Sequence, residues 1–390
     1  MTRKRKGWRD VAMLCSLMLL VACTPKKSAT PDTGYVSFNE YQTASRQLLI
    51  QHRRFQTSDH ATEIERNLPR EWRPVGKAKG GILLVHGLGD SPWSFTDIGP
   101  MLATQGYVVR TILLAGHGTA PKDLMGVDLR DWEQEVQRQT EMLHKEFSTV
   151  FLGGFSTGAN LVTVYALTHN DISGLLLFSP AYQAKSDLVW LTPIIRPFRP
   201  WLRPPNASRP QQTTVRYLNT PTNGFALFYR SSRNVKSHLS TYNKPVLIVT
   251  VAHDSVLNTQ QTLTLFERYF THPASKLIWY GELPADVTAP ARIAVKPDWL
   301  PQQRISQFSH MGILFSPDNP LYGSQAKEKF CWNGQNDVAF DGCMRGESVW
   351  YSDWGYRQPG KIYARLTFNP YWSWQNEAIG NFLRDATFKP

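Results

Sequence analysis

A regular alternation of short apolar runs and helical stretches begins near residue 80 and strongly limits how this 390-residue chain can fold. The first apolar run, 81–87, ends in a glycine turn. Five more follow at 107–114, 149–153, 172–178, 245–251 and 276–280. Continuous apolar runs of this length are typical of parallel strands that are buried on both faces.

Helical stretches separate these predicted strands at 97–105, 129–147, 159–167 and 260–270. In the second stretch, Trp132, Val136 and Leu143 fall near one face, as in a helix that packs on a core. Strands that alternate with helices predict an α/β fold, with a mainly parallel sheet covered by helices on both faces.

Residues 182–243 interrupt the alternation between two predicted strands. Their apolar side chains, set among prolines and arginines, are Trp190, Leu191, Ile194, Ile195, Phe198, Trp201 and Leu202. We expect this insertion to form a cap over a site at the sheet edge. The alternative is a surface segment that simply packs on the core.

Residues 154–158 carry the motif G-x-S-x-G, with Ser156 at its centre. The motif lies between the predicted strand 149–153 and the predicted helix 159–167, which is the setting of a nucleophile elbow. Ser156 would then be exposed at the head of a helix, where the positive end of the helix dipole stabilises negative charge. We therefore expect Ser156 to be a catalytic nucleophile.

A nucleophilic serine needs a base and an acid. In proteins with a nucleophile elbow, these follow the serine along the chain in the order Ser, Asp or Glu, His. His310 lies beyond the last predicted strand and is the expected base. Asp254 directly follows the strand 245–251 and is the expected acid, although a turn-forming role is the alternative. The remaining histidines after Ser156 are less well placed: His169, His238, His253 and His272.

The oxyanion of the reaction needs backbone N–H donors. We expect one from Thr157, which follows the nucleophile, and one from Leu88, in the loop after the first strong strand. His86 and His117 each follow a strand in a glycine-containing turn. We interpret both as structural histidines that shape the rim of the site.

These motifs together resemble the α/β-hydrolase fold, and within it the monoacylglycerol lipase and lysophospholipase group, also described as serine aminopeptidase S33-like. The matching segments cover roughly residues 75–315 and comprise 86–89, 116–118, 154–158, Asp254 and His310. The resemblance implies hydrolysis of a carboxylic ester by a Ser156–Asp254–His310 triad through an acyl-enzyme, with no metal or cofactor.

Two departures leave the substrate open: about 25 residues separate the last predicted strand from His310, and a C-terminal extension follows. Acyl transfer, thioester cleavage and peptide hydrolysis could use the same triad. A non-catalytic binding lipoprotein on a hydrolase scaffold is a further alternative.

The first residues are of a different kind. A basic start is followed by the apolar run 11–22, which is too short to span a bilayer and predicts a secretory signal over residues 1–22. Residues 20–23, Leu-Val-Ala-Cys, resemble the lipobox of bacterial lipoproteins, which implies acylation of Cys23. An ordinary signal with a chance cysteine is the alternative. We expect a flexible tether over residues 23–36 and the hydrolase domain over 37–390.

Charge and location bear on the partners. Residues 1–22 hold five basic residues and one acidic residue, so the net charge of +12 falls to +8 without them. This excess is dispersed and forms no basic–aromatic block, which argues against nucleic acid. The expected partners are a small acyl ester and, through the lipid anchor, a membrane. Thr24, the residue after Cys23, is not acidic, which in bacterial lipoproteins favours the outer over the inner membrane. We therefore expect the protein at the outer membrane of a bacterial envelope. The sequence does not indicate the oligomeric state.

Cys331 and Cys343 remain after the signal is removed and Cys23 is acylated. In an exported protein, two nearby cysteines predict a disulfide. Without a pair of partner histidines they do not predict a zinc site. The surrounding last 70 residues are rich in aromatic side chains, so we expect them to pack back on the main domain.

Overall fold

The computed structural model describes residues 34–205, 211–326 and 328–387. The predicted signal at 1–22, the lipidation site Cys23 and the first part of the tether lie outside the described residues. Within the described ranges, no helix is both long and apolar enough to cross a membrane.

An eight-stranded sheet with the order β1-β3-β2-β4-β5-β6-β7-β8 forms the centre of the molecule. The strands are β1 (Glu71–Trp72), β2 (Gly80–Val85), β3 (Tyr107–Ile112), β4 (Val150–Phe155), β5 (Gly174–Phe178), β6 (Val246–Val251), β7 (Lys276–Tyr280) and β8 (Ile293–Lys296). Only β1 is antiparallel to its neighbour. All six predicted strands are present, and their carboxyl ends meet at one edge of the sheet.

The strands β1 and β8 are additional to those that we predicted. β8 has four residues, and its side chains are largely half-buried, so it leaves no continuous apolar run in the sequence. It pairs in parallel with β7. The expected stretch of about 25 residues before His310 therefore contains one more strand, and the final loop to His310 begins after Lys296.

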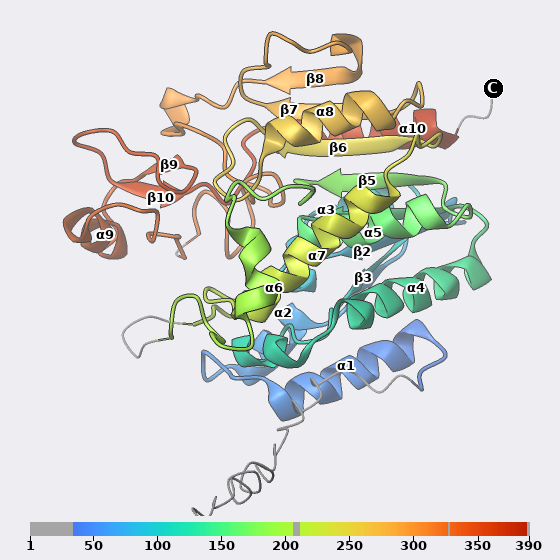
Figure 1. Cartoon of the computed structure of the whole chain (residues 1–390), viewed down its shortest axis with the longest axis horizontal. Helices are drawn as coiled ribbons and strands as arrows, with labels where there is room; N and C mark the ends of the chain where they lie inside the picture. The colour runs from blue at the N-terminus through green and yellow to red at the C-terminus, as the bar shows by residue number, and fades with distance from the viewer. Residues whose placement is uncertain (1–33, 206–210, 327, 388–390) are drawn as a thin grey trace, which may run out of the picture.

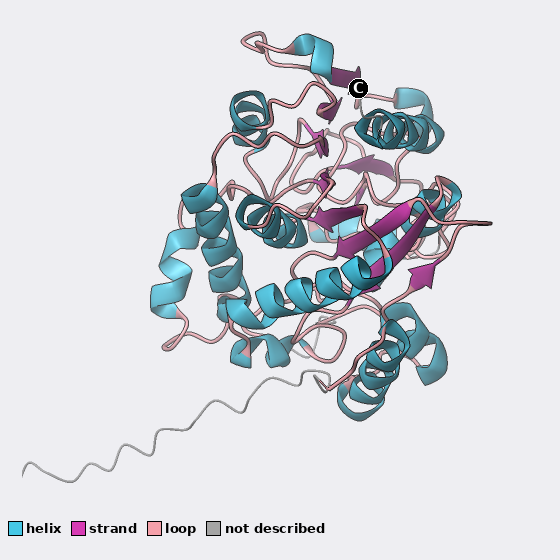
Figure 2. Ribbon diagram, turned by 90° about the vertical axis from the view of Figure 1, so that its right-hand side faces the viewer, coloured by secondary structure: helices cyan, strands magenta, loops and turns pink. Residues whose placement is uncertain are grey.

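Helices cover both faces of the sheet (Figures 1 and 2). One face packs against α1 (Phe38–His52), α4 (Leu129–Glu146), α5 (Thr157–Thr168), α7 (Thr222–His238) and α8 (Thr259–Tyr269). The other face packs against α3 (Ile98–Thr104) and α10 (Trp372–Thr387). The helix α2 (His60–Asn67) lies against α1 with its own small apolar cluster. This layering and strand order are those of an α/β-hydrolase fold, as predicted.

The insertion 182–243 contains the 3-10 turn η3 (Val189–Leu191), α6 (Thr192–Ile195) and α7. α7 packs directly on α5, where Asn160 Nδ2 donates to Ser231 Oγ at 3.0 Å. This part of the insertion thus covers the core, which was the alternative that the sequence left open. The segment between α6 and α7 instead reaches the carboxyl edge of the sheet through Val215 and Arg216.

The C-terminal extension packs back on the domain. It contains α9 (Asp337–Met344), the parallel pair β9 (Trp350–Ser352) and β10 (Tyr363–Arg365), and α10. Ile379, Phe382 and Leu383 of α10 are buried against the sheet. The predicted disulfide between Cys331 and Cys343 is present, with Cα atoms 5.6 Å apart. Further 3-10 turns among the described residues are η1 (Pro92–Phe95), η2 (Pro121–Gly126), η4 (Pro290–Arg292) and η5 (Pro301–Gln303).

Candidate active site

Ser156 stands on a sharp turn between β4 and α5. Its backbone has φ 53° and ψ −117°, a conformation that is strained for any residue with a side chain. A Cβ atom on Gly158 would overlap the carbonyl oxygen of Val85, and one on Gly154 would lie 2.5 Å from Ala159 N. The two glycines are therefore required by close backbone packing. The Ser156 side chain does not cap α5, which leaves its hydroxyl available.

The expected base and acid form a buried pair. His310 Nδ1 donates to Asp254 Oδ2 at 2.7 Å, and the two side chains are 10% and 0% exposed. The other carboxylate oxygen accepts from the backbone N–H groups of Val256 and Leu257 at 2.8 and 2.9 Å. These bonds fix the carboxylate. Because the proton on Nδ1 serves this hydrogen bond, Nε2 keeps the lone pair that a general base needs.

The fold brings His310 and Ser156 to the same edge of the sheet. The ring of Phe155, the residue before the serine, lies 4.9 Å from the His310 ring, measured between centroids. No hydrogen bond joins Ser156 Oγ to His310 in the part of the chain that the structure describes. Catalytic hydrogen bonds are often long without substrate and shorten in the reactive complex.

Two serine hydroxyls hold the backbone around His310 in place. Ser179 Oγ donates to the carbonyl oxygen of His310 at 3.2 Å, and Ser309 Oγ donates to that of Leu366 at 2.5 Å. Ser179 directly follows β5 and has a positive φ of 40°. Our sequence reasoning missed Ser179. The only feature of the sequence that could have indicated Ser179 is its position as a polar residue at the carboxyl end of a predicted strand.

The loop after β2 runs directly against the nucleophile. A Cβ atom on Gly87 would lie 3.1 Å from Ser156 Cβ. The backbone N–H groups of Leu88 and Thr157, the two expected oxyanion donors, have no acceptor among the described residues. Both groups are therefore free to donate to a ligand.

His86 and His117 hold this loop in place. The N–H of Leu114 donates to His86 Nε2 at 3.1 Å, and the N–H of Gly89 donates to His117 Nε2 at 3.0 Å. Burial lowers the pKa of His86 well below its usual value and lowers that of His117 to about 4. Both rings are therefore neutral at pH 7, which agrees with the structural role expected for them.

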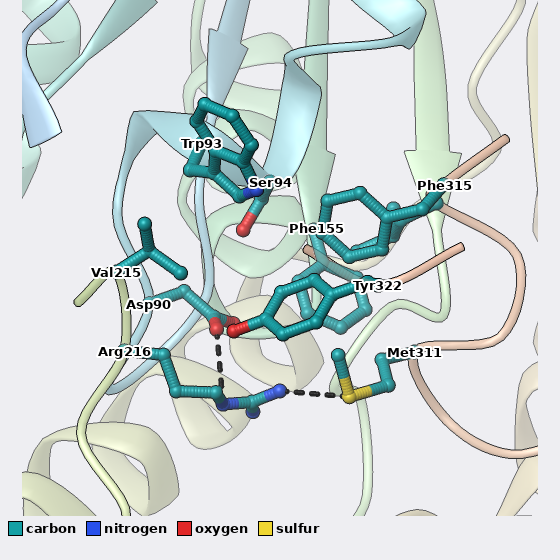
Figure 3. Close-up of a pocket in the computed structure, with 10 residues that line it drawn as sticks. Asp90, Trp93, Ser94, Phe155, Val215, Arg216, Met311, Phe315 and Tyr322 are labelled. Carbon is teal, nitrogen blue, oxygen red and sulfur yellow. Dashed lines mark hydrogen bonds and ion pairs between the residues drawn. The ribbon is translucent and has the colours of Figure 1, made fainter. Parts of the chain in front are cut away.

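Arg216 joins the insertion to the loop after β2 by an ion pair and to the loop of His310 by a hydrogen bond (Figure 3). Arg216 Nε lies 3.3 Å from Asp90 Oδ1, and Arg216 Nη1 donates to Met311 Sδ at 2.9 Å. Asp90 belongs to the loop after β2, and Met311 follows His310. Burial raises the pKa of Asp90, while the charges of Arg216 and His310 oppose that rise. The sequence offered no signal for this pair, because its members are far apart along the chain.

A second carboxylate lies near the acid. Ser255 Oγ, next to Asp254, donates to Asp353 Oδ1 at 3.0 Å. Burial and, after it, the charge of Asp254 raise the pKa of Asp353 to about 6. His253, by contrast, pairs with Asp298 at 2.6 Å, and its pKa is raised by that hydrogen bond. His253 therefore does not compete with His310 for the acid.

Among the described residues, no group of three or more His, Cys, Asp or Glu side chains is arranged to hold a metal ion. The candidate site brings together Ser156, the His310–Asp254 pair and the backbone N–H groups of Leu88 and Thr157. Residues 76–283 match the family model described as serine aminopeptidase, S33, which is more than half of the chain. The chain belongs to the serine aminopeptidase S33 family. The match contains the Ser156 elbow and Asp254 but ends before His310 and the C-terminal extension.

This S33 family member is also similar to a curated protein, the thermostable monoacylglycerol lipase of Bacillus sp. (strain H-257), with 34% identity over 101 residues. That stretch is 26% of this chain and 40% of the lipase, so the match spans about two fifths of the relative.

Two solved structures are similar as well. The Paleococcus ferrophilus monoacylglycerol lipase is 13% identical, with 82% of this chain and 98% of that one covered and a TM-score of 0.49. A soluble variant of Saccharomyces cerevisiae monoglyceride lipase is 18% identical, with 58% and 85% covered and a TM-score of 0.45.

Proposed function

We propose that this protein hydrolyses carboxylic esters with Ser156 as nucleophile, His310 as general base and Asp254 as the group that orients His310. The observation that carries the proposal is the buried 2.7 Å hydrogen bond between His310 and Asp254, at the sheet edge where the strained Ser156 turn lies. Strain at this turn is maintained by the close packing of two glycines, as expected for a functional position.

The proposed reaction has two steps. His310 Nε2 takes the proton of Ser156 as Oγ attacks the carbonyl carbon, and the Leu88 and Thr157 N–H groups stabilise the oxyanion. The bond to the leaving alcohol breaks, and the alcohol receives the proton from His310. Water then attacks the acyl-enzyme with the same base, which releases the carboxylic acid and returns the proton to Ser156.

The comparisons support ester chemistry without naming the substrate. The S33 family match and the similarity to a monoacylglycerol lipase favour an acyl ester such as a monoacylglycerol or a lysophospholipid. Two segments outside the elbow line a pocket beside Phe155: the part of the insertion with Val215 and Arg216, and the residues from Met311 to Tyr322. We expect these to select the acyl group and the leaving group.

The test is turnover of p-nitrophenyl butyrate by purified wild type and Ser156→Ala, together with labelling by a fluorophosphonate probe. We expect Ser156→Ala to lose labelling and at least about 10³-fold in kcat, because its nucleophile is gone. Ser237→Ala, on the exposed side of α7, is the matched control and should keep both. A Ser156→Ala variant that retains wild-type turnover would refute the triad. A wild type that is neither labelled nor active would instead favour a binding role.

We also propose that acylated Cys23 anchors this activity to the bacterial envelope, preferably at the outer membrane. The proposal rests on the lipobox-like residues 20–23 and the basic, then apolar, residues before them. An N-terminal anchor with several acyl chains would bind a membrane far more strongly than one myristoyl chain. It would place the site close to lipid-derived esters.

A further inference from the structure

The positive charge of this protein is concentrated in the insertion. Residues 23–390 hold 38 basic and 30 acidic residues. The insertion, residues 182–243, accounts for nine of the basic residues and one acidic residue, which leaves 29 of each sign elsewhere. We expected the excess to be dispersed along the chain, and this count by segment corrects that expectation. The insertion alone therefore gives an otherwise neutral protein its net attraction for anions.

Most of these cations have no carboxylate partner. Arg216 pairs with Asp90, and Arg230 lies 3.8 Å from Asp128. The other described cations of the insertion form no ion pair with any described carboxylate: Lys185, Arg196, Arg199, Arg203, Arg233 and Lys236. Their charge is therefore available to an anion outside the protein.

The same insertion exposes one apolar face of a short helical segment. η3 and α6 are consecutive, the residues that link them have helical backbone angles, and the N–H of Phe198 still donates to Ile195 O at 3.0 Å. Trp190, Ile194 and Phe198 are 49%, 59% and 87% exposed. Residues four apart lie on one face of a helix, so these three side chains form a single apolar surface. We call it the outer face of the insertion.

Polar contacts hold the opposite side of this segment on the first turn of α7, which lies beside α6 (Figure 1). Arg196 Nη1 donates to Asn223 Oδ1, and the N–H of Thr222 donates to Pro200 O at 2.9 Å. These contacts fix the orientation of the segment. The outer face is therefore held toward solvent by the fold.

The inner side of the segment lies close to the oxyanion loop. Val189 and Leu88 pack against the same small apolar cluster, formed by Ala181, Phe228 and Leu257. Leu88 is one of the two expected oxyanion donors. Anything that binds the outer face would therefore lie near the proposed active site.

A positively charged groove borders the outer face at Trp190. It has a volume of about 240 Å³ and lies between the start of the insertion and α7. Arg233 and Lys236 contribute to its wall, and Asp187 is the only carboxylate among the described residues that line it. Burial and, after it, the charge of Arg233 lower the pKa of Lys236, so an anion is favoured there. The groove fits a phosphate group beside an apolar surface.

From these observations we infer that the insertion docks on an anionic phospholipid bilayer, with its outer face in the interfacial region and its cations at the lipid phosphates. Helices that lie in a bilayer interface combine Trp, Phe and Leu on one face with Lys and Arg beside it. A bilayer matches both parts of this surface, because acyl chains accept the apolar side chains and anionic headgroups attract the cations. The inference does not depend on the proposed triad or on acylation of Cys23.

The test uses the chain from Thr24 to Pro390, which contains every described residue but neither the predicted signal nor Cys23. Binding is measured by co-sedimentation with phosphatidylcholine vesicles, with and without phosphatidylglycerol. We expect at least about tenfold stronger binding to the anionic vesicles at about 0.1 M NaCl, because each Lys or Arg near an anionic surface contributes about fivefold. Raising the salt to about 0.5 M should remove most of this difference.

Variants then assign the binding to the outer face and its cations. Phe198→Asp should weaken binding to anionic vesicles at least about tenfold. Arg199→Gln combined with Arg203→Gln should weaken it about tenfold and leave binding to phosphatidylcholine unchanged. Val338→Asp and Arg357→Gln are the matched controls, because both side chains are exposed on the C-terminal extension. Each control should stay within about threefold of the wild type.

Equal binding of the wild type to both kinds of vesicle, or binding by Phe198→Asp that equals that of the wild type, would overturn the inference. A dimer in solution that Phe198→Asp dissociates, without vesicle binding, would overturn it in favour of a second copy of the chain. Binding of single-stranded DNA without vesicle binding would overturn it in favour of nucleic acid. Because Phe198 is exposed, Phe198→Asp should keep the melting temperature and the turnover of p-nitrophenyl butyrate of the wild type, so the proposed hydrolysis is judged separately.

Discussion

Asp353 carries a negative charge into the protein interior next to the proposed catalytic acid. Its side chain is 5% exposed and accepts a hydrogen bond from Ser255 Oγ at 3.0 Å. Burial, followed by the charge of Asp254, raises its pKa from 3.8 to about 6. The ionised form is thus less favourable in the folded protein than in the unfolded chain, and we expect Asp353→Asn to stabilise the fold at neutral and alkaline pH.

The size and sign of this effect follow from proton linkage. Between pH 3.8 and about 6 the folded protein binds more protons at Asp353 than the unfolded chain does, so the free energy of unfolding falls as the pH rises through this window. Above pH 6 Asp353 is ionised, and the full decrease in the free energy of unfolding is present. At 1.36 kcal/mol for each pKa unit, it amounts to about 3 kcal/mol. Asparagine has no charge to bury and keeps an oxygen for Ser255, so Asp353→Asn should recover up to this amount.

Urea denaturation followed by tryptophan fluorescence, with the disulfide kept oxidised, measures the effect at pH 4 and pH 8. We expect Asp353→Asn to raise the free energy of unfolding by about 1–3 kcal/mol at pH 8 and by much less at pH 4. Asp187→Asn, an exposed carboxylate on the insertion, serves as control and should differ little from wild type at either pH. A gain that is the same at both pH values, or a loss at pH 8, would refute the reasoning.

Three further variants test other parts of the structure. Gly158→Ala should cost at least about 3 kcal/mol or prevent folding, because its Cβ would overlap the Val85 carbonyl oxygen; a normal melting temperature would contradict this. Cys331→Ser should lose about 3 kcal/mol by opening the small loop closed with Cys343, and reduced wild type should unfold at the same urea concentration as this variant. Cys23→Ser should abolish labelling by radioactive palmitate and release the protein from membranes; unchanged labelling would show that Cys23 is not the acylated residue.

The sheet and the elbow could be predicted because each leaves a local pattern. Parallel strands buried on both faces need uninterrupted apolar residues, so β2 to β7 were visible as runs. The glycines around Ser156 were visible because α5 approaches β2 at Gly158, and β4 at Gly154, too closely for a Cβ. The placement of Asp254 and His310 followed from these elements, since the carboxyl ends of parallel strands meet at one edge.

The remaining parts of the site leave no local pattern. β8 is a short, half-exposed edge strand, so its residues lack the apolar run that marks the others. Three separate loops bring Arg216, Asp90 and Tyr322 together. The sequence around each of these residues does not indicate the other two. Within the insertion that we expected as a cap, α7 packs on α5 as a layer of the core, whereas Val215 and Arg216 reach the carboxyl edge of the sheet.

The C-terminal extension supplies hydrogen-bond partners for the loop that carries His310. Apart from the short turn η5, this loop contains no helix or strand, so most of its backbone polar groups must be satisfied by partners elsewhere. Tyr351 receives a hydrogen bond from the Ser306 N–H and donates its own N–H to Arg304 O, at 2.8 and 2.7 Å. Directly before the base, Ser309 Oγ donates a hydrogen bond to the carbonyl oxygen of Leu366. Tyr351 lies in β9 and Leu366 directly follows β10, and α10 anchors this segment in the core. The extension is therefore a structural part of the proposed site, because it holds the loop that carries the base.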